Sequence, residues 1–266
     1  MTDILPTKAS SMTRKSHLKA SGSNDAWFAG ACLVAIVVWG TASNVKAQAV
    51  EPDPVVAASN GPEIAWNVAA TSDYVFRGVS QTEDDAAISA GVDLTAGTVY
   101  AGAWASNVAF PGDPDTNAEI DLYGGVRPEF AGFDWDFGVV GYFYTGQPDG
   151  ADYDYVEAKA AVSRAFGPAT IGGAVYWSPD FFGASEDEAT YVEANAAVSP
   201  ADKWTVSGAV GHQFLSSAFD YTTWNLGAAY QLTDNLALDL RYHDTDEHDF
   251  GSIYESRAVA SLKAVF

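Results

Sequence analysis

The chain ends in the stretch Ser252-Ile-Tyr-Glu-Ser-Arg-Ala-Val-Ala-Ser-Leu-Lys-Ala-Val-Phe266. Counting back from Phe266 in steps of two gives Ala264, Leu262, Ala260 and Ala258, all small or apolar, whereas charged and hydroxyl side chains lie between them. This alternation predicts a β-strand with one apolar face. The last strand of an outer-membrane barrel closes the barrel and turns such a face to lipid. The segment therefore predicts a bacterial outer-membrane β-barrel.

The N-terminal residues have the three parts of a secretory signal peptide. Basic residues (Lys8, Arg14, Lys15 and Lys19) precede an uncharged run of 13 residues from Trp27 to Trp39, and small residues follow. A membrane-spanning helix needs about 20 residues, so a single-pass anchor is the less favoured alternative. We expect residues 1–47 or 1–49 to be removed, with Met1 or Met12 as the start. Residues 48–61 then form a periplasmic lead-in, and residues 62–266 form the barrel.

The mature chain is strongly acidic. The sequence has 13 Lys and Arg against 35 Asp and Glu, and residues 1–47 hold five of the basic and two of the acidic ones, which leaves −25 for the remainder. So few basic residues exclude nucleic acid as a partner. The one cysteine, Cys32, lies in the signal segment, so the mature chain has no thiol or disulfide chemistry.

Period-two segments separated by turn residues follow Pro62. The twelve predicted strands cover residues 64–76, 88–95, 99–105, 117–126, 133–144, 154–164, 169–177, 189–198, 203–214, 222–231, 235–243 and 252–266. Connections alternate between short ones, such as 95–98, and longer acidic ones, such as 80–85. An even strand number with this alternation predicts an antiparallel up-and-down barrel with both termini on the periplasmic side, with about 10 or 14 strands as alternatives.

Two further patterns favour a barrel in lipid. Residues 155–163 recur as residues 191–199, 36 positions later with eight of nine identical, which indicates a duplicated hairpin. Aromatic residues gather at strand ends, as at a lipid–water interface. Those predicted near short turns are Phe133, Phe166, Trp204 and Phe266, and those near long loops are Tyr74, Phe76, Phe143, Trp177, Phe214, Trp224 and Tyr242.

The segment Ser72-Asp-Tyr-Val-Phe-Arg-Gly-Val-Ser-Gln-Thr82 resembles the N-terminal hallmark of TorF-family porins, small outer-membrane proteins of Gram-negative bacteria. The resemblance extends through residues 117–125, residues 141–144, the two Tyr-Val-Glu-Ala strands and Phe266. It implies passive passage of small solutes and names no solute, catalytic residue or cofactor. It also implies that outer-membrane lipid and lipopolysaccharide surround the barrel. By similarity to outer-membrane proteins, Phe266 is part of the signal that the barrel-assembly machinery recognises.

Inward-facing charged residues are the candidate pore lining. Ten acidic against five basic residues predict a negative lumen and a water-filled path that prefers cations, because carboxylates raise the local cation concentration. The acidic candidates are Asp73, Asp93, Glu119, Asp121, Asp134, Asp136, Glu157, Glu193, Asp239 and Glu255, and the basic candidates are Arg77, Lys159, Arg241, Arg257 and Lys263. Arg77 is expected beside the first long loop, as a selectivity element or as a structural partner of Asp73 or of a neighbouring strand.

Alternatives to an open channel follow from the same residues. About eight strands give a barrel filled by side chains and 16–18 leave a channel, so a filled structural or adhesive barrel is one alternative. An outer-membrane hydrolase would use His212 or His248 with Ser216, Ser217 or an aspartate, but His212 falls on the lipid-facing parity. Residues 243–249 combine acidic residues and histidines as a candidate divalent-cation loop, although their spacing fits no defined motif. We therefore expect no enzyme activity, no cofactor and no bound metal.

Overall fold

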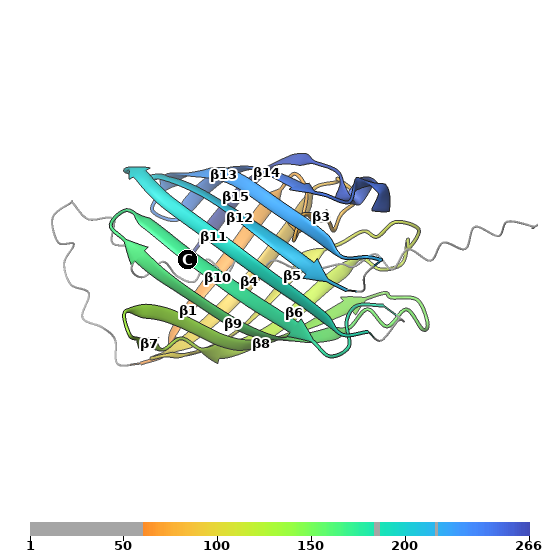
Figure 1. The fold of residues 1–266 in the computed structure, drawn as a ribbon, viewed down its shortest axis with the longest axis horizontal. Helices are drawn as coiled ribbons and strands as arrows, with labels where there is room; N and C mark the ends of the chain where they lie inside the picture. Colours follow the sequence, from red (N-terminus) through yellow and green to blue (C-terminus); the bar gives the residue numbers. More distant parts are fainter. Residues whose placement is uncertain (1–60, 184–186, 216–217) are drawn as a thin grey trace, which may run out of the picture.

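The computed structural model describes residues 61–183, 187–215 and 218–266. These residues form an all-β barrel of twelve long antiparallel strands (Figure 1), so the predicted fold class and strand number are confirmed. No helix in the described part of the chain is long and apolar enough to cross a membrane. The expected signal peptide, most of the lead-in, Ser216 and Ser217 lie outside the described residues.

Twelve strands make the barrel wall, and each pairs with the next around the barrel. They are β1 (Glu63–Thr71), β4 (Ala87–Ala96), β5 (Val99–Asn107), β6 (Ala118–Val126), β8 (Phe133–Thr145), β9 (Tyr155–Phe166), β10 (Ala169–Ser178), β11 (Ala189–Ala201), β12 (Trp204–Phe214), β13 (Tyr221–Thr233), β14 (Leu236–Thr245) and β15 (Arg257–Val265). The connections contain the short strands β2 (Val75–Phe76), β3 (Val79–Ser80) and β7 (Glu129–Phe130) and the 3₁₀ turns η1 (His248–Phe250) and η2 (Ser252–Tyr254).

The barrel closes where β15 pairs with β1. Their register runs from Asn67 opposite Val265 to Thr71 opposite Ser261. Beyond it, the Phe266 N–H donates to Trp66 O at 2.8 Å and the Trp66 N–H donates to Phe266 O at 3.0 Å. Closure satisfies the backbone groups that an open edge would leave unpaired. It also puts the start and the end of the barrel at the end with the short turns, opposite the long loops.

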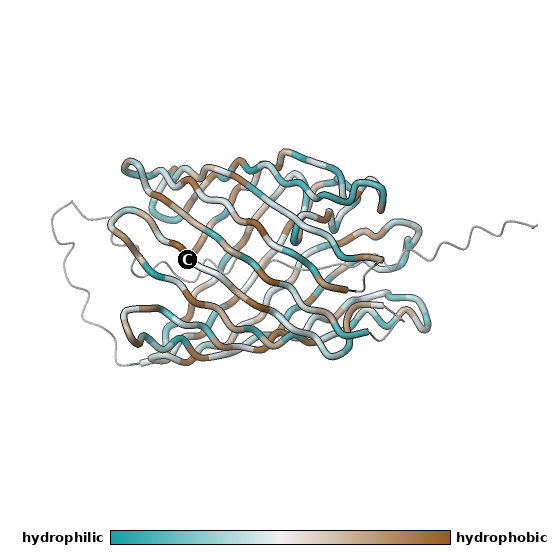
Figure 2. The backbone as a smooth tube through the Cα atoms, viewed as in Figure 1, coloured by the Kyte–Doolittle hydropathy of each residue, from teal (hydrophilic) through white to brown (hydrophobic). Residues whose placement is uncertain are grey.

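Hydrophobic and hydrophilic residues follow one another along the wall strands (Figure 2). Many outward-facing apolar residues are exposed: Ile88 is 72% exposed and Leu226 is 63% exposed. A barrel with an apolar outside and a polar inside is typical of outer-membrane proteins. The aromatic residues Phe143, Phe166, Trp177, Trp204, Phe214, Trp224, Tyr242 and Phe266 are exposed on the outside, as their predicted place in the aromatic belts requires.

The predicted strand 64–76 is wrong beyond Thr71. Residues 72–86, here called the lumenal hairpin, turn into the barrel, and β2 pairs there with β3. At its tip, Arg77 and Gly78 have φ values of 44° and 88°, as both central residues of a type I′ turn require. Tyr74 and Phe76, predicted for the lipid-facing belt, are instead buried inside the barrel. Period-two alternation looks the same in a wall strand and in a hairpin within the lumen, so the pattern could not separate them.

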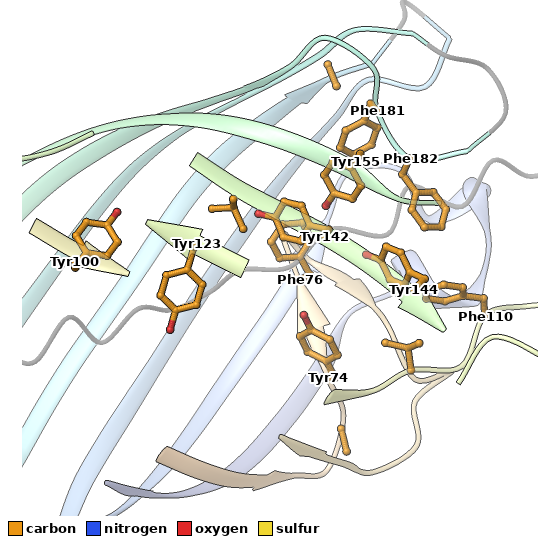
Figure 3. Close-up of a cluster of buried hydrophobic side chains, with 14 residues drawn as sticks. Tyr74, Phe76, Tyr100, Phe110, Tyr123, Tyr142, Tyr144, Tyr155, Phe181 and Phe182 are labelled. Atoms are coloured by element: carbon orange, nitrogen blue, oxygen red, sulfur yellow. The ribbon is translucent and has the colours of Figure 1, made fainter. Parts of the chain in front are cut away.

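The predicted strand 252–266 is wrong at its start, because β15 begins only at Arg257. Residues 252–254 form η2 instead, and Ile253 and Tyr254 pack there with Val79 of the lumenal hairpin in a buried cluster. A larger aromatic cluster lies inside the long-loop end of the barrel (Figure 3), and the lumenal hairpin contributes Tyr74 and Phe76 to it. The core of this protein is therefore the filled interior of one end of the barrel.

Candidate functional site: a lumen crossed by a hairpin

The lumenal hairpin lies across the barrel interior. It contacts inward-facing residues of nine wall strands, namely Trp104 of β5, Glu119 of β6, Glu157 of β9, Tyr176 of β10, Tyr191 of β11, Gln213 of β12, Thr223 of β13, Thr245 of β14 and Arg257 of β15. These strands surround most of the barrel circumference. The hairpin therefore forms a constriction in the long-loop half of the lumen.

Arg77, at the hairpin tip, contacts four wall strands. Its Nη2 donates to Glu157 Oε2 at 2.8 Å and its Nη1 donates to Gln213 Oε1 at 2.8 Å. The guanidinium also lies 4.2 Å from the ring centroid of Tyr191 and 4.8 Å from that of Tyr176. The Arg77 and Glu157 side chains are only 2% and 1% exposed. Burial makes this charge pair a fixed structural contact between the hairpin and the wall.

The base of the hairpin is held by a second ion pair. Arg257 Nη1 donates to Asp73 Oδ2 at 3.0 Å and also contacts Asp84. A cavity of about 320 Å³ opens beside this pair, and Glu255 lies on its lining. The structure thus brings together three predicted residues, Asp73, Arg257 and Glu255, at the long-loop end. Glu255 is exposed and precedes β15, so it lies at the mouth and not on the strand where it was predicted.

Glu119 and Asp121 are the two inward carboxyl groups of β6, and both are 0% exposed. The Tyr74 hydroxyl donates to Glu119 Oε1 at 3.3 Å. The Glu119 and Asp121 carboxyl groups also lie within hydrogen-bonding reach of each other, and the Tyr144 hydroxyl lies within reach of Glu119. No ion pair joins either group to a basic side chain of the described chain. At the level of the hairpin, Asp73 and Glu157 each pair with an arginine, so the carboxyl groups without a basic partner there are Glu119 and Asp121.

The short-turn half of the lumen has a different charge pattern. Asp136 Oδ2 accepts from Lys159 Nζ at 2.8 Å and from Arg127 Nε at 3.3 Å, and Asp239 pairs with Arg241 at 3.1 Å. Asp93 accepts a hydrogen bond from Tyr123 and Glu193 accepts one from Tyr191. Together with Lys263, the half-buried inward side chains of this half are four acidic and four basic, and the exposed Asp134 at the short-turn end is one more acidic residue. The half-buried charges are balanced, and these side chains are partly open to water.

The predicted pore-lining residues fall into three groups. Asp73 and Arg77 lie on the lumenal hairpin, and Glu255 lies at the mouth. The other twelve occupy inward positions of wall strands: Asp93, Glu119, Asp121, Asp134, Asp136, Glu157, Lys159, Glu193, Asp239, Arg241, Arg257 and Lys263. Asp134 is exposed at the short-turn end. The structure brings the residues of the hairpin level together and separates them from the charge-balanced half.

Two kinds of inward residue were missed from the sequence. Arg127 follows β6 directly and completes the Asp136 ion pairs. Eight of the 13 tyrosines also face inward from the wall strands: Tyr100, Tyr123, Tyr142, Tyr144, Tyr155, Tyr176, Tyr191 and Tyr221. The sequence pattern could have identified these tyrosines. Val99, Ala101 and Ala103 are predicted to face outward, and the alternation then places Tyr100 inside the barrel. Their hydroxyl groups make the lumen polar as well as filled.

The histidines of the other candidate sites each lie within hydrogen-bond distance of a neighbouring side chain. His248 Nε2 lies 2.8 Å from Asp244 Oδ1, and this hydrogen bond raises the pKa of His248 above its ordinary value of 6.5. His212 faces outward, 3.1 Å from the Thr222 hydroxyl, as its parity predicts. Among residues 61–183, 187–215 and 218–266, no group of three or more His, Cys, Asp or Glu side chains is arranged to hold a metal ion.

Known structures share this barrel. A KdgM porin structure aligns with a TM-score of 0.55 at 8% identity, covering 76% of this chain and 99% of that chain. A second structure, "KdgM porin in complex with disordered oligogalacturonate", aligns with a TM-score of 0.53 at 7% identity, covering 76% of this chain and 98% of that chain. A NanC porin structure aligns with a TM-score of 0.51 at 10% identity, covering 76% of this chain and 98% of that chain. At these identities the likeness concerns the fold. It is the fold of porins, whereas the resemblance to the TorF family in particular stays a prediction.

Sequence comparison gives the family. No curated protein sequence matches the chain. Residues 56–266 match the family described as "Bacterial protein of unknown function (Gcw_chp)". The matched range includes the whole barrel, the lumenal hairpin and Phe266. Because this match covers most of the chain, the protein belongs to the Gcw_chp family.

Proposed function

We propose that this protein is an outer-membrane, porin-like channel for the passive diffusion of small hydrophilic solutes. The observation that carries the proposal is the closed barrel itself, with an apolar outside suited to lipid and charged and hydroxyl side chains facing the lumen. The likeness of the fold to the KdgM and NanC porins supports it. The short-turn end would face the periplasm and the long loops the outside, and Phe266 would contact the assembly machinery.

We further propose that the channel prefers cations. Glu119 and Asp121 have no basic partner at the level of the hairpin, and a cavity of about 450 Å³ among the long loops is lined by four aspartates: Asp149, Asp152, Asp154 and Asp180. Two unit charges about 8 Å apart interact by about 0.5 kcal/mol in bulk water and about 2 kcal/mol at an effective dielectric of 20. Such energies favour cation entry several-fold at low salt, and screening weakens the preference as salt rises.

The lumenal hairpin determines how freely solutes pass. Its buried contacts with nine strands fill much of the long-loop half, so the wild-type conductance should be small for a twelve-stranded barrel. The same filling supports a second candidate function, a structural barrel without transport. In that case the Arg77–Glu157 pair would only hold the interior together.

Planar-bilayer recording separates the two functions. The purified, folded protein is inserted into a lipid bilayer, and single-channel currents are measured in KCl. Step-like currents that scale with salt concentration are expected for the channel. A verified folded barrel that inserts but never conducts, even after its hairpin contacts are broken, would overturn the channel proposal in favour of the structural barrel.

A further inference from the structure

One basic side chain faces outward from the barrel wall. Along β9, Glu157 and Lys159 face the lumen, and Arg164 lies on the opposite, outward parity together with Val162 and Phe166. Within the twelve described wall strands, Arg164 is the one Lys or Arg at an outward position, and it is exposed. A charge on this face is strongly unfavourable at the bilayer midplane and much less so near the interface. The position of Arg164 along the strand therefore decides what it can contact.

Arg164 lies at the short-turn end of the barrel. β9 ends two residues later at Phe166, and residues 167–168 turn the chain into β10. Two strand residues span about 7 Å. A long arginine side chain can keep its stem along the apolar surface and extend its charged end toward the water. The guanidinium is therefore at the level of the lipid–water interface, where the phosphate groups of phospholipids lie.

The surroundings of the guanidinium are apolar. Its Cζ lies 5.1 Å from the ring centroid of Phe133 on β8 and 5.3 Å from that of Phe166. Its neighbour across the β9–β10 pair is Ile171, which is 57% exposed on the same outward face. None of the ion pairs among the described residues includes Arg164. The two rings thus hold a cation in place, and the described chain supplies no anion for it.

We propose that Arg164, with Phe133 and Phe166, binds the phosphate group of an anionic phospholipid in the leaflet at the short-turn end. A guanidinium can donate two parallel hydrogen bonds to phosphate oxygens while its plane stacks on an aromatic ring. One phosphate diester neutralises the single charge of Arg164, and the acyl chains would lie along Val162 and Ile171 toward the midplane. The inference goes beyond the proposed channel, because it requires the barrel to lie in lipid and does not require it to conduct.

Native mass spectrometry of the folded protein in detergent tests the site. The protein is mixed with increasing amounts of phosphatidylglycerol, and the fraction of barrels that retain one lipid gives the apparent affinity. R164Q should lower this affinity about fivefold, as expected when one basic side chain at a lipid surface is lost. F133L keeps an apolar side chain but removes the ring, and it should lower the affinity less. Diacylglycerol, which lacks the phosphate, should bind wild type and R164Q equally.

The matched control is K203Q. Lys203 is exposed in the short turn between β11 and β12, so this variant removes the same charge at the same end of the barrel, and it should keep the wild-type affinity. Arg164 and Lys203 are both exposed, so neither substitution removes a buried side chain, and heat-modifiable migration verifies that each barrel has formed.

Equal phosphatidylglycerol affinity of wild type and R164Q would overturn the site. An equal loss in K203Q would also overturn it, because the lipid would then respond only to net charge. The same holds if R164Q weakens diacylglycerol binding as much, since the phosphate would not be the group that is recognised. A folded barrel that retains the lipid through Arg164 but never conducts would reject the channel and keep the site. A conducting barrel whose lipid affinity ignores Arg164 would reject the site alone.

Discussion

Arg77 and Glu157 form a buried ion pair, with Nη2 and Oε2 2.8 Å apart, that joins the tip of the lumenal hairpin to the barrel wall. The two residues are 80 positions apart in the sequence. Because Gln213, Tyr176 and Tyr191 also contact the guanidinium, the tip is anchored on four neighbouring strands, β9 to β12. These contacts, together with the Asp73–Arg257 pair at the base, must break if the hairpin is to leave the lumen.

Replacing Arg77 with Ala should loosen the hairpin and increase single-channel conductance. Removing one partner of a buried charge pair typically destabilises a protein by about 3–5 kcal/mol, because the other charge stays buried without compensation. The thermal unfolding temperature of R77A in detergent should therefore fall as its conductance rises. R241A is the matched control, since Arg241 lies in the lumen but bonds only to wall residues. A conductance equal to that of R241A would show that the hairpin does not limit passage.

The tip glycine gives a second test of how the hairpin is seated. A Cβ at Gly78 would clash with Thr223 Oγ1 and approach Thr245 Cγ2 to 2.8 Å, in addition to the cost of a positive φ. Gly97 also has a positive φ, but nothing lies within 4 Å of its Cβ position. G97A should therefore cost only about 1–2 kcal/mol for the left-handed backbone, whereas G78A should cost more. Denaturant unfolding of both variants measures the difference, and equal destabilisation would be inconsistent with the observed packing.

The wall of the barrel was predictable from sequence, because lipid outside and water or polar side chains inside impose a strict period of two. That period placed Ile88, Val92 and Leu94 on one face and Asp93 on the other, and the structure agrees. Turn residues at 97–98 and 167–168 fixed the hairpin connections in the same way. Within the wall, the local alternation of residues therefore predicts which side chains face outward and which face the lumen.

The lumenal hairpin was not predictable in the same way. Tyr74 and Phe76 continue the alternation of β1, and nothing in the pattern says that the chain has turned inward. Length does not separate them either: residues 64–76 form a run of 13, and the wall strands β8, β11 and β13 are also 13 residues long. The partners of Arg77 could not be found at all, because Glu157 and Gln213 come from distant strands whose approach depends on barrel closure.

Deleting Phe266 should reduce assembly strongly. Burying a Phe side chain in an apolar environment contributes only about 1.5–3 kcal/mol, but the deletion also removes both backbone hydrogen bonds with Trp66 at the closing seam. F266A keeps these two bonds and should assemble better than the deletion. The yield of heat-modifiable barrel in the outer-membrane fraction measures both effects. Wild-type yield from the deletion would contradict the role of this residue.

The raised pKa of His248 predicts a pH-dependent contact in the last long loop. A pKa above the ordinary 6.5 means that protonated His248 stabilises the loop at lower pH, and that this contribution is lost as pH rises through the folded value. NMR titration of the imidazole should give a pKa above 6.5 in wild type and a lower one in D244N. The same value in both proteins would mean that Asp244 does not hold the proton on His248.

The reversal potential in a planar bilayer under a KCl gradient tests the central claim most directly. For a cation-preferring channel we expect a reversal potential with the sign set by K⁺, and the magnitude of this potential should fall as total salt rises. The D93N/D121N/E193Q variant should move it toward zero, and R77Q should move it further in the cation direction. Folded, inserted protein without conductance in wild type, R77A and R77Q would contradict the channel, and an anion-selective potential would contradict the assignment of its selectivity to the lumenal carboxylates.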